Sequence, residues 1–379
     1  MDFSFSQEQR LLRSSLQACL RQHADFASHQ RAVQAGNAWR PELWQALAGQ
    51  LGVLGLGLCD DSELLADNAQ NTMIVMEELG RALAIEPYLD VAIVAGYLLG
   101  QWRSAAAPAL RDALCAGQAM PVLAWSEAGS RNDFRQQALP AQWRDGQWIL
   151  NGRKTVVMSA PLASHFIVSA RTTGRAGEER GLSLFVVPAG TPGLNIDPYP
   201  TIDERCAADL LFAQVQLPDS ARLGEQDQAL ALLEAARCHG IAALSAEAVG
   251  VMEALLQQTR DYCQQRRQFS QPLSRFQVLQ HRMVDMYLQL EMSRAASYRA
   301  TLSLSADVLE RERSAAAAKV TVARACRFIG QNAVQLHGGM GMSDDVPVSH
   351  YFKRATAIER ELGSADEQLL RYQQLAVSA

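Results

Sequence analysis

The sequence predicts an α+β protein of several domains, because its hydrophobic pattern changes twice along the chain of 379 residues. Apolar residues recur at helical spacing over residues 1–118, which predicts an all-α N-terminal domain. Short runs rich in β-branched and aromatic residues then fill residues 119–222. Consecutive strands without helices between them favour a β-sandwich or barrel over a Rossmann sheet. The helical period returns over residues 223–379, where we expect a C-terminal four-helix bundle.

The first helix has a clear start in the sequence. Ser6 and Gln9 have the spacing of a capping box, and apolar residues follow them at helical spacing. Gly and Asp residues at 55–61 predict a break in the helical pattern. The other helical patterns of this domain cover residues 41–51, 71–84, 88–100 and 104–116.

Gly, Pro, Asn and Asp separate the strand-like runs of the middle domain. These runs cover residues 120–125, 147–150, 154–158, 165–169, 182–187 and 210–215. The long helical segments of the last domain cover residues 226–265, 274–307 and 312–336. Small residues between Ala242 and Gly250 predict close packing of the first of these helices against a neighbour.

Composition argues against several classes of function. The formal net charge of −5 and the pI near 5.9 give no excess of positive charge for DNA, RNA or an anionic membrane. The seven cysteines have no Cys-x-x-Cys or paired Cys/His spacing, so we expect reduced thiols and no metal site. The N-terminus is charged from residue 2, and no apolar run approaches the roughly 20 residues of a membrane helix. We therefore expect a cytoplasmic protein without a nucleic-acid or membrane partner.

One stretch near the C-terminus has the residues of a ligand contact. Gly338 and Gly339 end a predicted helix, and the missing side chains let the backbone approach a bulky ligand closely. The alternative for this pattern alone is a helix cap followed by a turn. Further residues at fixed spacing accompany the two glycines: Gln335, Gly341, Pro347, Lys353, Arg354, Gly363 and Ser364.

A second stretch, between two predicted bundle helices, has residues suited to a nucleotide. Arg266 can hold a pyrophosphate through its fork of donors, Phe269 offers a stacking face, and Gln277 can bridge a ribose or phosphate. The alternative is a solvated basic turn that is anchored by the Phe.

The two stretches, in this order and about 70 residues apart, resemble those of the acyl-CoA dehydrogenase family. The resemblance extends over nearly the whole chain and implies that family's fold, with FAD as the cofactor. In the family, the stretches hold the adenosine half of FAD across a subunit boundary. The resemblance assigns cofactor binding to Arg266, Phe269, Gln277, Gln335, Gly338, Gly339, Ser364 and Ser126.

The expected flavin-ring pocket departs from the family pattern. The loop over residues 124–133 resembles the family's loop beside the isoalloxazine ring and keeps Ser126, but Asn132 replaces a serine that contacts flavin and substrate. Val156 stands where the family has a Trp that shields the ring, and Met158 replaces a Thr that contacts it. The alternative reading of these segments is an edge turn and a core strand.

The family reaction needs a carboxylate that removes the α-proton of an acyl thioester while a hydride passes to the flavin. The resemblance places this glutamate at one of two positions, which Leu362 and Gly240 occupy here. Glu247 lies about two helical turns beyond Gly240 and is the candidate catalytic base. A buried glutamate that pairs with an arginine or a hydroxyl is the alternative for this residue.

Other titratable residues are weaker candidates. Glu361 neighbours the usual position of the glutamate, but a shift of one residue along a helix turns a side chain by about 100°. We expect Glu234 to be a solvated residue near the start of its helix. We expect His337 and His350 to have structural roles.

Two functions are compatible with these residues. The first is a homo-oligomeric, FAD-dependent acyl-CoA dehydrogenase that uses Glu247 as a relocated base. The second is a subunit without the usual glutamate, which completes the FAD site of another chain in a hetero-oligomer. We favour the second, because the interface contacts to FAD persist while the ring pocket and the base have changed.

Within this family, the sequence resembles the small subunits of bacterial pimeloyl-CoA-type dehydrogenases and of heterotetrameric enzymes that act on steroid side-chain thioesters. Residues 246–250 and 350–354 carry part of this similarity. It implies an α2β2 assembly, an acyl-CoA thioester as substrate and electron delivery to an electron-transferring flavoprotein. No motif identifies the acyl group of the substrate, because the polarity of the acyl pocket determines which acyl group binds.

Overall fold

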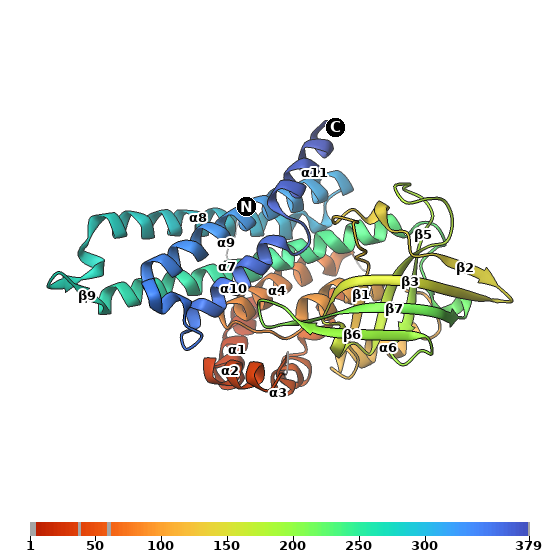
Figure 1. The fold of residues 1–379 in the computed structure, drawn as a ribbon, viewed down its shortest axis with the longest axis horizontal. Helices are drawn as coiled ribbons and strands as arrows, with labels where there is room; N and C mark the ends of the chain where they lie inside the picture. Colours follow the sequence, from red (N-terminus) through yellow and green to blue (C-terminus); the bar gives the residue numbers. More distant parts are fainter. Residues whose placement is uncertain (1–4, 37–38, 59–61, 378–379) are drawn as a thin grey trace. The chain divides into compact units, whose positions relative to one another are not determined.

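A computed structural model describes residues 5–36, 39–58 and 62–377 (Figure 1). The contacts divide the chain into two compact units. The bundle unit comprises Met1–Gly36, Ala69–Ala84 and Ile241–Ala379, and the sheet unit comprises Asn37–Asn68 and Ile85–Gly240. The helical, β and helical order of the predicted fold class is confirmed, while the predicted domain limits at residues 118 and 222 stay predictions.

Long helices build the bundle unit, and α7, α8, α9 and α10 run alongside one another in Figure 1. Helix α9 packs against α8, α10 and α11. The bounds of these helices are α7 Ala229–Gln265, α8 Gln277–Leu302, α9 Val308–His337, α10 Pro347–Arg360 and α11 Ala365–Val377. Helix α7 begins in the sheet unit and continues into the bundle unit.

Helix α1 Gln7–His23 begins at the predicted capping box. The Gln9 backbone N–H donates to Ser6 Oγ at 3.2 Å, and the Ser6 backbone N–H donates to Gln9 Oε1 at 3.0 Å. The pattern of apolar residues did not predict α2 Phe26–Gln34, whose buried residues are only His29 and Ala32. Asp25 caps this helix by accepting from the Ser28 backbone N–H at 2.7 Å, which is a local signal that sequence reading can use.

Helices α4 and α7 pack closely, as the small residues predicted. Helix α4 spans Ser62–Arg81. A Cβ atom added at Gly250 would lie 2.0 Å from the Glu77 carbonyl oxygen, and one added at Gly80 would lie 2.1 Å from the Glu247 carbonyl oxygen. Neither glycine therefore tolerates a side chain without movement of the backbone. This close packing fixes the position of Glu247 along α7 relative to α4.

The other predicted helices of the first 118 residues are shorter or irregular. Residues 41–51 include α3 Pro41–Gln45 followed by the π-helix η1 Ala46–Gln50, and the 3-10 helix η2 Val53–Leu58 overlaps the start of the predicted break. Residues 59–61, which belong to the same predicted break, lie outside the described residues. The segment 88–100 is a π-helix, η3 Leu89–Ala95, followed by α5 Gly96–Gly100, and α6 spans Ala107–Cys115.

The sheet unit contains two four-stranded sheets, in the orders β1-β4-β5-β8 and β2-β3-β7-β6. Strands β1 and β4 pair in parallel, and the other pairs within these sheets are antiparallel. The strands of the first sheet are β1 Pro121–Ala124, β4 His165–Arg171, β5 Leu182–Pro188 and β8 Arg222–Leu223. Those of the second are β2 Ala141–Arg144, β3 Gln147–Met158, β6 Leu194–Pro200 and β7 Cys206–Leu217.

The strand prediction was incomplete, and it also lacked the short strands β8, β9 and β10. The runs 147–150 and 154–158 form one strand, β3, with register shifts between Leu150 and Gly152 and between Lys154 and Val157. Strand β2 was not predicted, because three of its four residues are exposed and two of them are Gln142 and Arg144. Strand β6 was not predicted because it contains two prolines, which are unusual inside a strand.

Helix α7 is long and strongly apolar. Among the described residues it is the one helix that could cross a membrane by length and composition, contrary to the expectation that no apolar run is long enough. However, 83% of its most apolar window is buried inside the protein, as in the core helix of a globular fold. Six of the seven cysteines lie in the described part of the chain, and none of these six forms a disulfide.

Candidate functional site

A short hairpin in the connection from α7 to α8 carries Phe269, one of the predicted cofactor residues. Its strands are β9 Arg267–Gln268 and β10 Gln271–Pro272, so Phe269 and Ser270 form a two-residue turn. Both turn residues are left-handed, with φ of 50° at Phe269 and 66° at Ser270. This turn type favours Asn-Gly, and a non-glycine residue at each position costs conformational energy. The strained turn holds Phe269 outward, 86% exposed.

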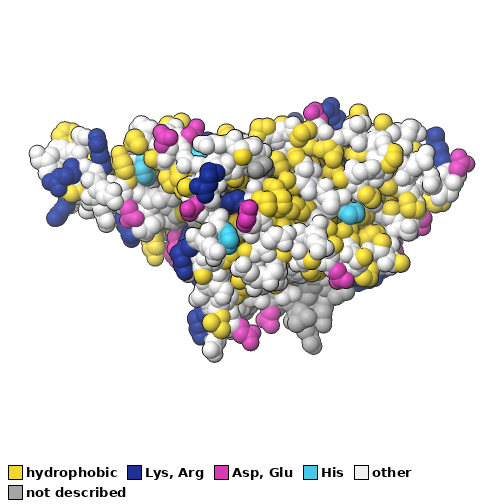
Figure 2. All heavy atoms as spheres, turned by 90° about the horizontal axis from the view of Figure 1, so that it is seen from below, with side chains coloured by type: hydrophobic (Ala, Val, Ile, Leu, Met, Phe, Trp, Pro, Cys, Tyr) yellow, Lys and Arg dark blue, Asp and Glu magenta, His cyan; other side chains and the backbone are white. Residues whose placement is uncertain are grey.

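Arg266 and Gln277 flank this hairpin at the end of the bundle unit. Both side chains are exposed, and Gln277 is the first residue of α8. Among the described residues, the Arg266 guanidinium has no hydrogen-bond or ion-pair partner, so its donors are available to a phosphate. Figure 2 shows Lys and Arg side chains at the end of the molecule where Figure 1 places β9.

The second predicted stretch lies at the end of α9. Gly338 caps this helix with φ of 61°, and Gln335 in its last turn is exposed. A Cβ atom added at Gly338 or Gly339 would meet nothing within 4 Å among the described residues, so the backbone here is open to close approach. This geometry fits the predicted contact of the glycine backbone with FAD.

An aromatic contact brings the two stretches together. The His337 ring at the end of α9 stacks on the Tyr262 ring of α7, with centroids 4.5 Å apart. Tyr262 also accepts, through its carbonyl oxygen, the hydrogen bond of the Arg266 backbone N–H at 2.8 Å. His337 is bonded to the Ala333 carbonyl at 2.8 Å, and burial lowers its pKa. These contacts support the structural role predicted for His337.

Ser364 is not freely available to a ligand, because it forms hydrogen bonds with a neighbouring glutamate. The Ser364 backbone N–H and hydroxyl donate to Glu367 Oε2 at 2.8 and 3.0 Å. Ser364 also lines a cavity of about 350 Å³, where the charged neighbours are Arg324, Arg327, Glu359, Arg360 and Asp366. The predicted contact of Ser364 with FAD therefore requires the ligand to displace or share the Glu367 carboxylate.

The turn that carries Leu362 is held rigidly. Leu362 has φ of 58° and Gly363 has φ of 107°, and the Gln368 side-chain amide donates to the Leu362 carbonyl at 2.8 Å. Lys319, which is fully buried, donates to the carbonyls of Ile358 and Glu359 at 2.8 and 3.1 Å. Burial lowers the pKa of Lys319 to about 8. The turn thus presents a leucine where the family has its base.

Glu247, the candidate base, forms a buried ion pair within the bundle unit. Arg354 Nε donates to Glu247 Oε1 at 2.6 Å, and Arg354 Nη2 donates to Glu247 Oε2 at 2.9 Å. The same guanidinium donates through Nη1 to Glu361 Oε2 at 2.9 Å. One arginine therefore holds both carboxylates, which is the alternative that the sequence left open for Glu247. A proton taken by Glu247 would break this pair.

His350, from helix α10, also has the structural surroundings that we expected. Its side chain is buried, and Nε2 is bonded to the Asp344 carbonyl at 2.9 Å. The ring also packs edge-on against Phe26, with centroids 5.2 Å apart.

In the sheet unit, a buried lysine organises the loop predicted to lie beside the flavin ring. Lys154 Nζ donates to Glu127 Oε1 at 2.7 Å, to the Trp125 carbonyl at 3.1 Å and to Gln137 Oε1 at 3.1 Å. Glu127 in turn accepts the backbone N–H groups of residues 138 and 139 at 2.8 and 3.1 Å. Burial lowers the pKa of Lys154 to about 8. Ser126 is half-buried at the start of this loop.

A second charged pair, Glu234 and Arg237, contacts the same loop and was not predicted from the sequence. Glu234 is mostly buried and pairs with Arg237, so the expectation of a solvated Glu234 was wrong. Burial is the main reason why the pKa of Glu234 is raised. Arg237 Nη1 donates to the Asn132 carbonyl at 3.1 Å, and its guanidinium lies over the Phe134 ring at 5.0 Å. The i, i+3 spacing of Glu234 and Arg237 was the available signal.

The strand residues that differ from the family lie at a bulge. Val156 has φ of 51°, which is strained for a β-branched residue, and its side chain is 54% exposed. Its backbone N–H donates to Asp209 Oδ1 at 3.0 Å. Met158 is half-buried two residues further along β3. An exposed valine covers less of a flavin ring than an indole does.

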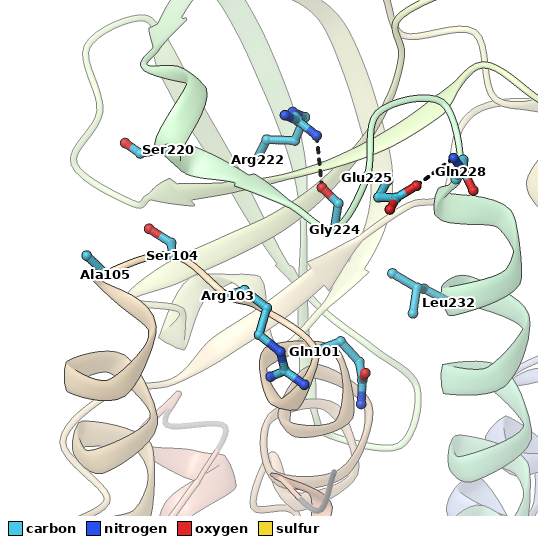
Figure 3. Close-up of a pocket in the computed structure, with 10 residues that line it drawn as sticks. All are labelled: Gln101, Arg103, Ser104, Ala105, Ser220, Arg222, Gly224, Glu225, Gln228 and Leu232. Carbon is cyan, nitrogen blue, oxygen red and sulfur yellow. Dashed lines mark hydrogen bonds between the residues drawn. The ribbon is translucent and has the colours of Figure 1, made fainter.

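Figure 3 shows a separate pocket of about 720 Å³ in the sheet unit. Arg103 and Gln101 come from the segment after α5, while Arg222 belongs to β8. Arg222 Nη1 donates to the Gly224 carbonyl at 2.9 Å, and the Gln228 amide donates to Glu225 at 2.7 Å. None of the predicted cofactor residues lines this pocket, so it is not part of the site described above.

Comparisons with known proteins agree with this architecture. The family model for the acyl-CoA dehydrogenase middle domain matches residues 122–215, and the model for the C-terminal domain matches residues 232–374. Human short-chain specific acyl-CoA dehydrogenase is 28% identical over 365 residues, which cover 94% of this chain and 87% of that protein.

Two solved structures are similar along the whole chain. The steroid ACAD Tcur3481-Tcur3483 has a TM-score of 0.86 at 27% identity and covers 98% of both chains. The ChsE4-ChsE5 complex from Mycobacterium tuberculosis has a TM-score of 0.86 at 25% identity and covers 100% of both chains.

Fold and site together define a flavin-dependent oxidoreductase of helical, β and helical architecture. The chain belongs to the acyl-CoA dehydrogenase family, whose cofactor is FAD and whose reaction is oxidation of a CH–CH bond in an acyl-CoA thioester.

Proposed function

We propose that this chain is the subunit of a hetero-oligomeric acyl-CoA dehydrogenase that lacks the catalytic glutamate and completes the FAD site of a glutamate-bearing partner chain. The observation that carries this proposal is the pairing of Arg354 with both Glu247 and Glu361, next to Leu362. Both of these candidate carboxylates are thus ion-paired with the same buried arginine. The substrate is an acyl-CoA thioester, and the electrons pass on to an electron-transferring flavoprotein.

The exposed hairpin end supports a role in binding FAD for another chain. FAD, when bound, supplies the hydride acceptor of the reaction. In this chain, Arg266 would hold a phosphate, Phe269 would cover an aromatic ring, and Gly338 and Gly339 would let the backbone approach the nucleotide. An aromatic side chain that is 86% exposed gains stability when another surface covers it.

Helix α8 supports assembly with another chain. Val284, Leu288 and Met292 follow at i, i+4 and i+8, which places them on one face of the helix. Their side chains are 54%, 53% and 57% exposed. An apolar stripe of this kind is typical of a surface that a second chain covers. The solved ChsE4-ChsE5 complex, which this chain resembles, is by its name an assembly of two different proteins.

The homo-oligomeric alternative needs Glu247 as its base. The bidentate pair with Arg354 argues against this role, because both carboxylate oxygens already accept hydrogen bonds from a cation. A general base must instead direct an oxygen toward the substrate proton. Cytoplasmic location stays a prediction.

Assays of the chain alone and in its complex test the proposal. We expect the lone chain to show no turnover with a range of acyl-CoA thioesters, and to gain bound FAD and turnover after co-expression with a glutamate-bearing family member encoded beside it. Full turnover by the lone chain would refute the subunit role. The matched control is the lone chain with Leu362→Ala, which should behave as the unmodified chain does.

A further inference from the structure

The connection between α7 and α8 concentrates positive charge in an otherwise acidic protein. Residues 260–282 contain five arginines and one aspartate, a net charge of +4, whereas the whole chain has −5, so the remaining residues carry −9. Arg260 pairs with Asp261 at 3.3 Å. The four other arginines, which we call the basic end, are Arg266, Arg267, Arg275 and Arg282.

Most of the basic end has no anionic partner within the chain. All four arginines are exposed. Arg267 Nη2 donates to the Ser270 carbonyl at 2.9 Å, which leaves its charge uncompensated. The guanidinium groups of the other three have no hydrogen bond or ion pair with any residue in the described part of the chain. Like charges that gather in one short segment repel one another until an anion approaches them.

The cofactor accounts for only part of this charge. The diphosphate of FAD carries two negative charges, and the family resemblance assigns Arg266 to it. Four arginines exceed the diphosphate by two positive charges. Water solvates the remaining charges in the lone chain, and a surface that covers them in a complex must supply anionic groups to offset the lost solvation.

The basic end lies next to the N-terminal end of the apolar stripe of α8. Arg282 lies one helical turn from Val278, which is 67% exposed. It precedes Val284 by two residues, about 200° around the helix, so Arg282 and the stripe lie on different faces of α8. Interfaces between proteins commonly combine a central apolar region with a charged rim. The arginines flank the N-terminal end of the stripe of Val284, Leu288 and Met292, where such a rim can form.

We infer that the glutamate-bearing partner chain covers the basic end with a surface that carries at least two carboxylates, in addition to the diphosphate of FAD. This inference rests on the proposed function and specifies the chemistry of the partner. The carboxylates pair with Arg275 and Arg282, which the cofactor motif does not include. Their charge steers the two chains together and sets the orientation of the hairpin on the partner.

Salt-dependent association measures this contribution. The Kd of the two chains is measured in 50 mM and 500 mM NaCl with Arg275→Gln and Arg282→Gln combined. We expect the Kd to rise roughly tenfold at low salt and to change little at high salt, because salt screens the lost charge pairs. Arg144→Gln with Arg153→Gln, which removes two exposed arginines of the sheet unit, is the matched control and should leave the Kd unchanged.

A zero-length cross-link identifies the anionic partner directly. The variant with Arg275→Lys and Arg282→Lys keeps the charges and supplies amines that a carbodiimide joins to carboxylates within salt-bridge distance. We expect mass spectrometry of the assembled complex to find both lysines linked to Asp or Glu residues of the partner chain. The Arg144→Lys and Arg153→Lys variant should give no link to the partner.

The outcomes separate this inference from the proposed function. A complex that forms with unchanged Kd in the Gln variant, and without cross-links from the Lys variant, would overturn the acidic docking surface while leaving the subunit role intact. Cross-links to a second copy of this chain would also overturn the inference, and they would count against the hetero-oligomer itself. Turnover by the lone chain would refute the subunit role independently of both measurements.

Discussion

Arg354 holds Glu247 through two hydrogen bonds of 2.6 and 2.9 Å, and both side chains are almost completely buried. Helix α10 supplies the arginine and α7 supplies the glutamate, so the pair ties two helices of the bundle unit together. Removal of one partner from such a pair leaves an uncompensated buried charge, which costs about 3–5 kcal/mol. This ion pair gives Glu247 a structural role in the bundle unit.

Glu247→Gln should therefore reduce stability without abolishing catalysis by the assembled enzyme. We expect the free energy of unfolding of the lone chain to fall by about 3 kcal/mol, because Arg354 keeps only Glu361 as a charged partner. Turnover of the assembled complex should stay within about threefold of the unmodified complex. Chemical denaturation and steady-state kinetics measure the two effects. Loss of turnover in a variant that keeps its fold and its FAD would identify Glu247 as the base.

Phe269→Ala should weaken retention of FAD by the assembled complex. The Phe269 side chain is 86% exposed in the lone chain, so its removal should leave the melting temperature of that chain nearly unchanged. Loss of a stacking contact of this kind costs about 1–3 kcal/mol in ligand binding. Absorbance of FAD after gel filtration measures the loss. Leu11→Ala, which truncates another exposed apolar residue, is the control, and equal FAD content in both variants would contradict this role.

Gly250→Ala should destabilise the bundle unit strongly. The new methyl group would lie 2.0 Å from the Glu77 carbonyl oxygen and 2.6 Å from the Arg81 backbone nitrogen, so α4 and α7 must move apart. Forced overpacking of this kind costs about 1–3 kcal/mol or more. Gly49→Ala is the matched control, because nothing lies within 4 Å of its added Cβ atom among the described residues. Equal thermal stability of the two variants would show that the helices do not pack as described.

The buried lysines predict a dependence of stability on pH. Burial lowers the pKa of Lys154 and of Lys319 to about 8, from 10.5 in the unfolded chain. Between these values the unfolded chain binds more protons, so each lysine contributes more to stability as the pH rises from about 8 to 10. The gain is at most about 1.4 kcal/mol per pH unit for each lysine.

Lys154→Met and Lys319→Met provide the comparison for this effect, because other groups also titrate in this range. We expect the free energy of unfolding of the unmodified chain, relative to each variant, to rise between pH 8 and 10. Urea denaturation at several pH values measures the difference. A difference that stays constant over this range would show that the lysines keep their ordinary pKa values.

Much of the fold follows from local signals. The Ser6 and Gln9 capping box and the glycine cap at Gly338 depend on residues a few positions apart, and the structure contains both. Strands β2 and β6 escaped prediction because an exposed edge strand needs little apolar surface, and because β6 contains Pro198. The π-helices η1 and η3 also escaped, because their pattern of apolar residues does not differ from that of an α-helix.

The site was predictable only where its residues are close in sequence. The hairpin with Arg266 and Phe269 was found as one motif, and its exposure follows from its place between two helices. The partner of Glu247 was not predictable, because Arg354 lies 107 residues away and several arginines were equally available in the sequence. Burial of Glu234 likewise depends on how Arg237 folds over Phe134.

The most direct test replaces the catalytic glutamate of the partner chain by glutamine in the assembled complex. If this chain supplies no base, the complex should keep its FAD and its affinity for the acyl-CoA thioester, and turnover should fall to the level of the lone chain. Turnover that persists at half or more of the original rate, with this chain carrying Glu247, would contradict the account.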